Sequence, residues 1–87
     1  MPYVNSEARD RLDFEFSQIA GTLLAETPGE LNYLFTRILC RYVDHKGLSY
    51  QTINDISGAL TECLAEFRRR IVVPYEERKR MLNGDVY

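Results

Sequence analysis

The sequence predicts an all-α fold, a three-helix antiparallel bundle or hairpin with a long third helix kinked at Pro74. Apolar residues recur at intervals of three and four in three successive segments, and no segment alternates with the two-residue period of a strand. Hydrophobic residues make up 45% of the 87 residues and charged residues 28%, a composition typical of globular proteins. We therefore expect a single helical domain over residues 1–87.

The first helix is expected over residues 6–25. Its apolar stripe is the loosest of the three, because Phe14 falls outside it. The stripe comprises Leu12, Phe16, Ile19, Leu23 and Leu24. The packing of this helix is therefore the least defined part of the predicted fold.

The second helix is expected over residues 28–46. Thr27 can cap its first turn, where Glu30 supplies the reciprocal acid of a capping box. Gly47 follows a lysine and is a typical stop, since glycine tolerates the backbone conformation found just beyond a helix. The apolar stripe consists of Leu31, Leu34, Phe35, Ile38, Leu39, Tyr42 and Val43.

The third helix is expected over residues 50–82, and either Ser49 or Thr52 can start it. Only a short turn precedes it, so the second and third helices are expected to run antiparallel. Its stripe is the cleanest of the three and consists of Ile53, Ile56, Leu60, Cys63, Leu64, Phe67 and Ile71.

Pro74 interrupts this third helix. Its ring removes one backbone hydrogen bond and clashes with the preceding turn, at a cost on the order of 3 kcal/mol. Charge pairs at four-residue spacing support helix on both sides of it, so we expect one bent helix. These pairs are Glu66–Arg70 and Glu76–Arg80. A helix of about 30 residues spans ~45 Å, so its end has to project or to pack against another chain.

Catalytic and metal-binding chemistry find no support in the sequence. The one histidine, His45, lies beside Asp44 at an expected helix end, where a partly exposed imidazole needs no catalytic role. A zinc site needs several clustered ligands, which Cys40, Cys63 and one histidine do not supply. We expect both cysteines to be reduced and buried, and we expect no enzymatic activity, no metal and no cofactor.

Membrane association is not expected either. No apolar run approaches the roughly 20 residues of a membrane-spanning helix. Residues 1–25 also lack the apolar core of a signal peptide. The predicted location is therefore the cytoplasm.

The formal net charge of −2 hides an asymmetry along the chain. Residues 1–66 carry five basic and ten acidic side chains, whereas residues 67–87 carry six basic and three acidic ones. Nucleic-acid binding needs a wide basic face, so a net acidic chain counts against it. A local basic cluster suits a small anion or an acidic patch on a protein.

The candidate binding site is the basic segment that follows the third stripe. Arginine binds phosphates and carboxylates bidentately, and a tyrosine there can stack on a base or cover the site. The site residues are Arg68, Arg69, Arg70, Tyr75, Arg78, Lys79 and Tyr87. In an alternative interpretation, the three consecutive arginines are surface ion-pair partners of Glu66 and neighbouring acids. The next candidate surface is marked by Tyr3 and Tyr33.

A homo-oligomer, either a dimer or a higher assembly, is expected. The chain has six tyrosines, four phenylalanines and no tryptophan, and tyrosine is favoured at interfaces because its ring buries well while its hydroxyl stays wet. The apolar and tyrosine residues outside the stripes exceed what a bundle of this size can cover. They are Tyr3, Val4, Phe14, Tyr33, Tyr50, Val72, Val73, Tyr75, Val86 and Tyr87.

Five segments resemble a family of small bacteriophage and prophage proteins without an established activity. The segments are MPYV at 1–4, TPGELNY at 27–33, YQTINDI at 50–56, VPYE at 73–76 and NGDVY at 83–87. The resemblance covers nearly the whole chain and is weakest over residues 13–24. It implies a phage context, hence the cytoplasm of a bacterial host cell, and it assigns no residue a role.

This context and the basic segment together predict a non-enzymatic phage accessory protein that binds and neutralises a host antiviral defence component. The target is either a small anionic signal of the nucleotide type, which the arginines and Tyr75 favour, or a host defence protein. The alternative is a structural or assembly module whose long helix docks on another phage protein. Small size and the absence of catalytic motifs are compatible with both.

Overall fold

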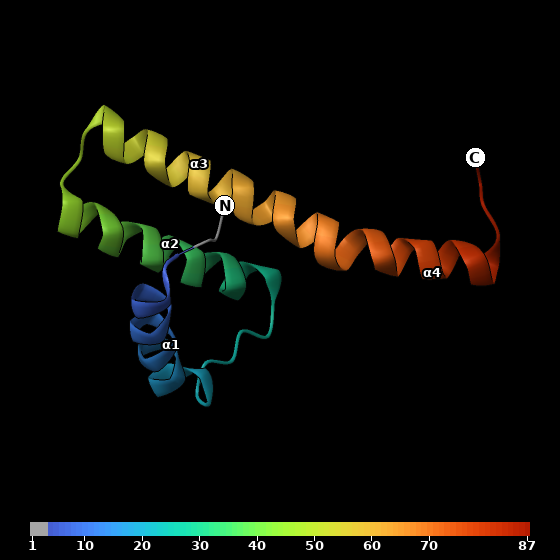
Figure 1. Cartoon of the computed structure of the whole chain (residues 1–87), viewed down its shortest axis with the longest axis horizontal. Coiled ribbons are helices and arrows are strands. Elements are labelled where there is room, and N and C mark those ends of the chain that lie inside the picture. The colour runs from blue at the N-terminus through green and yellow to red at the C-terminus, as the bar shows by residue number, and fades with distance from the viewer. Residues whose placement is uncertain (1–3) are drawn as a thin grey trace. The chain divides into compact units, whose positions relative to one another are not determined.

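The computed structural model describes residues 4–87, and every regular element among them is helical. The all-α prediction is therefore confirmed, including the long third helix (Figure 1). The long helix consists of an α-helical part, a π-helical part and a second α-helical part. The elements are α1 (Ser6–Ala20), α2 (Pro28–Lys46), α3 (Tyr50–Phe67), η1 (Arg68–Val72) and α4 (Val73–Asn83).

The described residues fall into two compact units, one ending at Ile53 and one beginning at Asn54. The first unit contains α1, α2 and the opening turn of α3. The second unit is the remainder of the long helix and the C-terminal tail. The expectation of a single domain over residues 1–87 stays a prediction.

The first helix is shorter than expected, ending at Ala20 and not at residue 25. Its start is capped by Asn5, whose side chain accepts a hydrogen bond from Ala8 N at 2.8 Å. At its end, the Ile19 carbonyl accepts hydrogen bonds from Thr22 N at 3.0 Å and from Leu23 N at 2.8 Å, which close the last turn. Gly21 disfavours further helix, so Leu23 lies in the following loop and not on the helix stripe.

Both ends of α2 are as predicted. Thr27 Oγ1 accepts a hydrogen bond from Glu30 N at 3.1 Å, and Glu30 Oε1 accepts one from Glu26 N at 3.1 Å. At the other end Gly47 has a φ of 85° and donates its N–H to the Val43 carbonyl at 2.7 Å. A side chain at this φ would be strained, which explains the glycine stop.

Of the two candidate starts for the third helix, Ser49 is the one used. Its Oγ accepts a hydrogen bond from Thr52 N at 3.1 Å, and its carbonyl accepts one from Ile53 N at 3.0 Å. The helix begins at Tyr50 and continues to Asn83, one residue beyond the predicted end.

The local disturbance expected at Pro74 takes the form of the π-helical segment just before it. Val73 donates its N–H to the carbonyl of Arg68, five residues earlier, instead of the usual four. Widening this turn lets the chain pass a residue that has no N–H of its own. The ribbon consequently continues from α3 into α4 without a gap (Figure 1).

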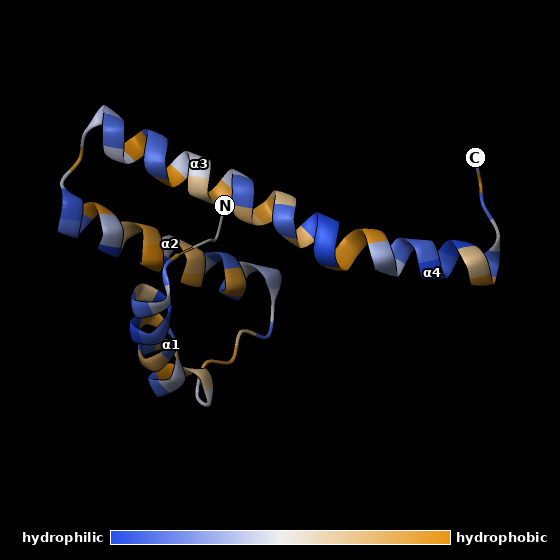
Figure 2. Ribbon diagram, viewed as in Figure 1, coloured by the Kyte–Doolittle hydropathy of each residue, from blue (hydrophilic) through white to orange (hydrophobic). Residues whose placement is uncertain are grey.

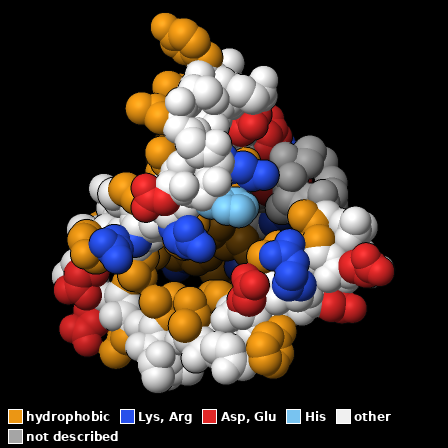
Figure 3. Space-filling model, turned by 90° about the vertical axis from the view of Figure 1, so that its left-hand side faces the viewer, with side chains coloured by type: hydrophobic (Ala, Val, Ile, Leu, Met, Phe, Trp, Pro, Cys, Tyr) orange, Lys and Arg blue, Asp and Glu red, His pale blue; other side chains and the backbone are white. Residues whose placement is uncertain are grey.

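The apolar stripes lie open to solvent. No hydrophobic side chain among the described residues is buried, and Leu60 and Phe67 on the third stripe are 43% and 53% exposed. Hydrophobic positions recur along α3 in Figure 2, and Figure 3 shows hydrophobic side chains open to solvent beside charged ones. The expected burial of Cys40 and Cys63 is wrong, since both side chains are exposed.

Candidate functional site

All seven predicted site residues lie in the unit that begins at Asn54, so their mutual geometry is defined. The three consecutive arginines form most of η1, while Tyr75, Arg78 and Lys79 lie on α4. Tyr87 ends the tail that follows Gly84. The π-helical segment thus carries the arginines, and the proline separates them from the second basic group.

Glu66 holds two of the three arginines. Its Oε1 is 2.6 Å from Arg69 Nη2 and its Oε2 is 3.3 Å from Arg70 Nε. The hydrogen bond from Arg69, aided by that from Arg70, lowers the pKa of Glu66 although partial desolvation opposes the shift. The Glu66 side chain is only 16% exposed beneath the two guanidinium groups. This geometry matches the ion-pair interpretation for Arg69 and Arg70, while no ion pair involves Arg68 within residues 4–87.

Tyr75 is the centre of the second basic group. The guanidinium carbon of Arg78 lies 6.0 Å from the centre of the Tyr75 ring, and Lys79 Nζ lies 5.6 Å from it. Spacings of three and four residues place both cations on the same side of α4 as the ring. Cation–π contacts at exposed sites contribute about 0.5–1 kcal/mol each. Tyr75 is 52% exposed, so an aromatic and two cations are presented together to solvent.

Arg80 joins α4 to the tail and does not use its predicted partner. It pairs with Glu77, whose Oε2 accepts from Arg80 Nε at 3.3 Å, and not with Glu76. Asp85 Oδ2 approaches the same guanidinium at 3.7 Å. Hydrogen bonding to Arg80 lowers the pKa of Glu77. Asp85 also accepts a hydrogen bond from Tyr87 N at 2.9 Å, and the Tyr87 side chain is fully exposed.

The basic segment lies on the surface of one continuous helix, with its cations pointing in several directions around the axis. Such a segment can bind carboxylates on a partner surface, but by itself it encloses little of a small ligand. Within residues 4–87, no three or more His, Cys, Asp and Glu side chains gather as metal ligands would. Nor does any helix in that part of the chain combine the length and apolar character of a membrane span.

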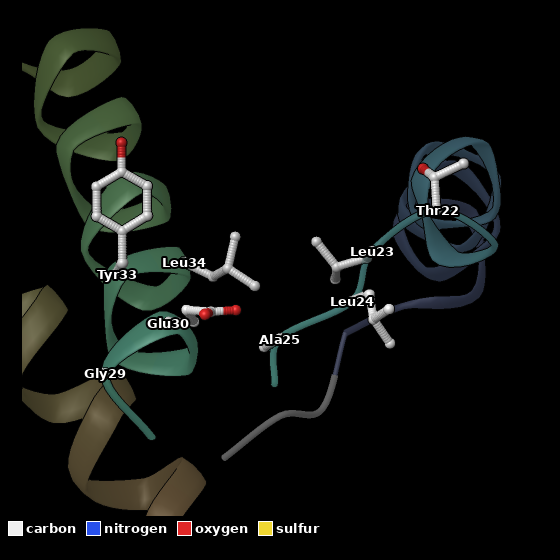
Figure 4. Close-up of a pocket in the computed structure, with 8 residues that line it drawn as sticks. All are labelled: Thr22, Leu23, Leu24, Ala25, Gly29, Glu30, Tyr33 and Leu34. Carbon is white, nitrogen blue, oxygen red and sulfur yellow. The ribbon is translucent and has the colours of Figure 1, made fainter. Parts of the chain in front are cut away.

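A shallow cavity of about 350 Å³ lies elsewhere, between the α1–α2 loop and the first turns of α2 (Figure 4). The charged side chain in its lining is Glu30, whose carboxylate accepts a hydrogen bond from Glu26 N. Tyr33, part of the next candidate surface, contributes to the wall, and Tyr3 lies outside the described residues. The lining consists of Thr22, Leu23, Leu24, Ala25, Gly29, Glu30, Tyr33 and Leu34.

The sequence interpretation missed this cavity because it placed Leu23 and Leu24 on the first helix. The glycine at position 21, followed by Thr22, is the signal that could have moved both leucines into a loop. The predicted basic residues take no part in the lining. The sequence therefore predicted the basic segment as a candidate site and did not predict this cavity.

Comparison with known proteins identifies a family and nothing closer. Residues 1–86 match the domain of unknown function DUF6899. No curated protein and no solved structure matches the chain.

Proposed function

Since the chain belongs to this family of unknown function, its role has to be argued from its own surface, and we propose that it is a non-enzymatic binding protein whose long helix docks on another polypeptide. The phage context comes from the resemblance of the five segments described above. In that context the role is that of an accessory or assembly module. A protein partner replaces the small anion as the favoured target, for the reasons that follow.

The observation that carries this proposal is the open apolar stripe of the long helix. Ile53, Phe67 and Ile71 are 46%, 53% and 56% exposed. The unit beginning at Asn54 is a single helix, so it has no element of its own to cover the stripe. Helices in water depend on packing of their apolar face for most of their stability. An exposed stripe of this length supports a docking role.

The surroundings of the stripe also favour a polypeptide partner. The arginines lie in the last turn of the stripe and Tyr75 follows it along the helix, and Tyr and Arg are enriched where proteins bind each other. Arg69 and Arg70 share the single negative charge of Glu66, which lowers their value for capturing a free anion. A partner that brings its own carboxylates would meet the remaining cations at the edge of the apolar contact.

Neutralisation of a host antiviral defence component by capture of a nucleotide-type signal is the second candidate. The group of Tyr75, Arg78 and Lys79 favours it, because an aromatic ring and two cations are the contacts that a base and a phosphate use. A thermal-shift screen against nucleotide second messengers tests this candidate. A rise of several degrees with one of them would support it, and no shift at millimolar concentration would reject it.

The docking proposal is tested by photo-crosslinking from the stripe. A photoreactive phenylalanine analogue at Phe67 is expected to form an adduct with another polypeptide in producing cells. The matched control is the same analogue at Gly58, on the opposite face of α3 by helical spacing, where a side chain meets nothing within 4 Å. Equal adduct formation at both positions, or none at Phe67, would contradict the proposal.

A further inference from the structure

We infer that the partner covering the long helix is a second copy of this chain, whose long helix runs antiparallel to the first. This inference rests on the proposed docking role, because it names the partner of the same stripe. Three properties of the helix point to it: the distribution of its charges, its length and the spacing of its apolar residues.

The two halves of the long helix carry opposite charge. Residues 50–66 contain three acidic side chains and no lysine or arginine. Residues 67–83 contain six basic and two acidic side chains, a balance of +4. Two copies in antiparallel alignment place each acidic half beside a basic half, whereas a parallel alignment places like beside like. Charge complementarity of this kind selects both the partner and its direction.

The length of the helix also favours a second copy. Its three parts of 18, 5 and 11 residues make 34 residues, about 51 Å at the rise of an α-helix. The other helices of the chain have 15 and 19 residues, so neither matches the 34-residue helix from end to end. The long helix of a second copy necessarily has the same length.

The apolar spacing is that of a helix seam. Ile53, Leu60 and Phe67 follow one another at seven-residue intervals, and Ile56 and Cys63 repeat the interval three residues later. A seven-residue repeat keeps one face against a partner helix over several turns. The midpoint of the helix falls between Glu66 and Phe67, so a twofold axis there makes both contacts equivalent and lays the later part of each stripe, from Cys63 to Ile71, beside the same part of the other.

The assembly is tested by mass and by charge reversal on the full chain. At tens of micromolar, the wild type is expected to have twice the 10.2 kDa mass of the monomer. Asp55→Lys/Glu62→Lys makes both halves basic, and Arg68→Glu/Arg78→Glu/Lys79→Glu makes both halves acidic. Each variant alone is expected to dimerise at least tenfold more weakly, and an equimolar mixture is expected to recover the dimer.

A wild type that remains a monomer under these conditions overturns the inference, as does a mixture that associates no better than its components. Circular dichroism of the mixture shows whether the chains are helical. If a variant alone loses helicity, recovery of helix and of dimer mass together in the mixture is still the expected result. Helix that recovers without the dimer counts against the inference.

The direction of pairing is tested by spin labels in a Cys40→Ser/Cys63→Ala background. A label at residue 54 is expected about 38 Å along the axis from its counterpart. A label at residue 68, close to the midpoint, is expected about 10 Å away, near the interaxial distance. Short distances at both positions would indicate parallel helices and contradict the charge argument. If the protein is a monomer but still forms a crosslink from Phe67, the proposed docking role stands and only the inference that the partner is a second copy fails.

Discussion

At the scale of single residues, Glu66 organises the basic segment. It links the end of α3 to the π-helical segment, because Arg69 and Arg70 both reach back to its carboxylate. The arginines that look most available in the sequence are therefore the ones already engaged. Arg68 and the group of Tyr75, Arg78 and Lys79 remain to bind a partner.

The pH dependence of stability should report on Glu66. Its pKa lies below the ordinary value of 4.5, so its contribution to stability is present above about 4.5 and is lost as the pH falls through the lowered value. Glu66→Gln should lower the melting temperature slightly at pH 7, and the difference should be smaller at pH 3. Thermal melts at the two pH values check this.

The control for that experiment is Glu77→Gln, which removes a second carboxylate with a lowered pKa. It leaves the ion pairs of Glu66 with Arg69 and Arg70 intact. Only Glu66→Gln should lower the stability of the helix at η1. A difference that persists unchanged at pH 3 would show that the effect does not come from the ion pairs.

At the scale of elements, the long helix accommodates Pro74 by widening the turn that precedes it. Pro74→Ala restores a backbone N–H and removes the ring, so the helix should be stabilised by about 1 to 3 kcal/mol. Amide hydrogen exchange should become slower over residues 68–78. Unchanged or faster exchange there would mean that the π-helical segment is stabilised by something other than the proline.

Gly58 offers a second test on the same helix. A Cβ at this position meets nothing within 4 Å, so Gly58→Ala should stabilise the helix by about 0.5–1 kcal/mol through the higher helix propensity of alanine. Chemical denaturation measures the change. A loss of stability would reveal another backbone in close approach on that face.

The helices could be predicted from the sequence wherever side-chain caps mark their ends. Thr27, Glu30 and Gly47 predicted the first and last residues of α2 correctly, because these signals act within one turn. The end of α1 could not be placed in the same way, since the apolar spacing of Leu23 and Leu24 continues past Gly21 although the helix does not. Local periodicity alone cannot distinguish a last turn from a loop that keeps its spacing.

The candidate site was only partly readable. The positions of the cations follow directly from the helix, but which of them are engaged depends on rotamers that spacing does not decide. Arg80 pairs with Glu77 and Asp85 and not with Glu76, although the spacing of Glu76 is equally suitable. The cavity near Tyr33 depends on a loop conformation, which the sequence pattern does not specify.

At the scale of the whole molecule, the chain has apolar stripes and no buried hydrophobic side chain among its described residues. Leu60→Ala distinguishes an open stripe from a covered one. If a second chain covers Leu60, the substitution should cost about 2–5 kcal/mol. If the leucine stays 43% exposed, the loss should fall well below that range. Denaturation at high and low protein concentration separates the two.

Cys63 allows the most direct measurement of the central claim that another chain covers the stripe in solution. The thiol lies on the stripe and is exposed in the single chain, and Cys40→Ser leaves it as the only cysteine. The rate of its reaction with a disulfide reagent should fall as protein concentration rises, because association covers it, and should lose this dependence in urea. A rate that is fast and independent of concentration would contradict the account.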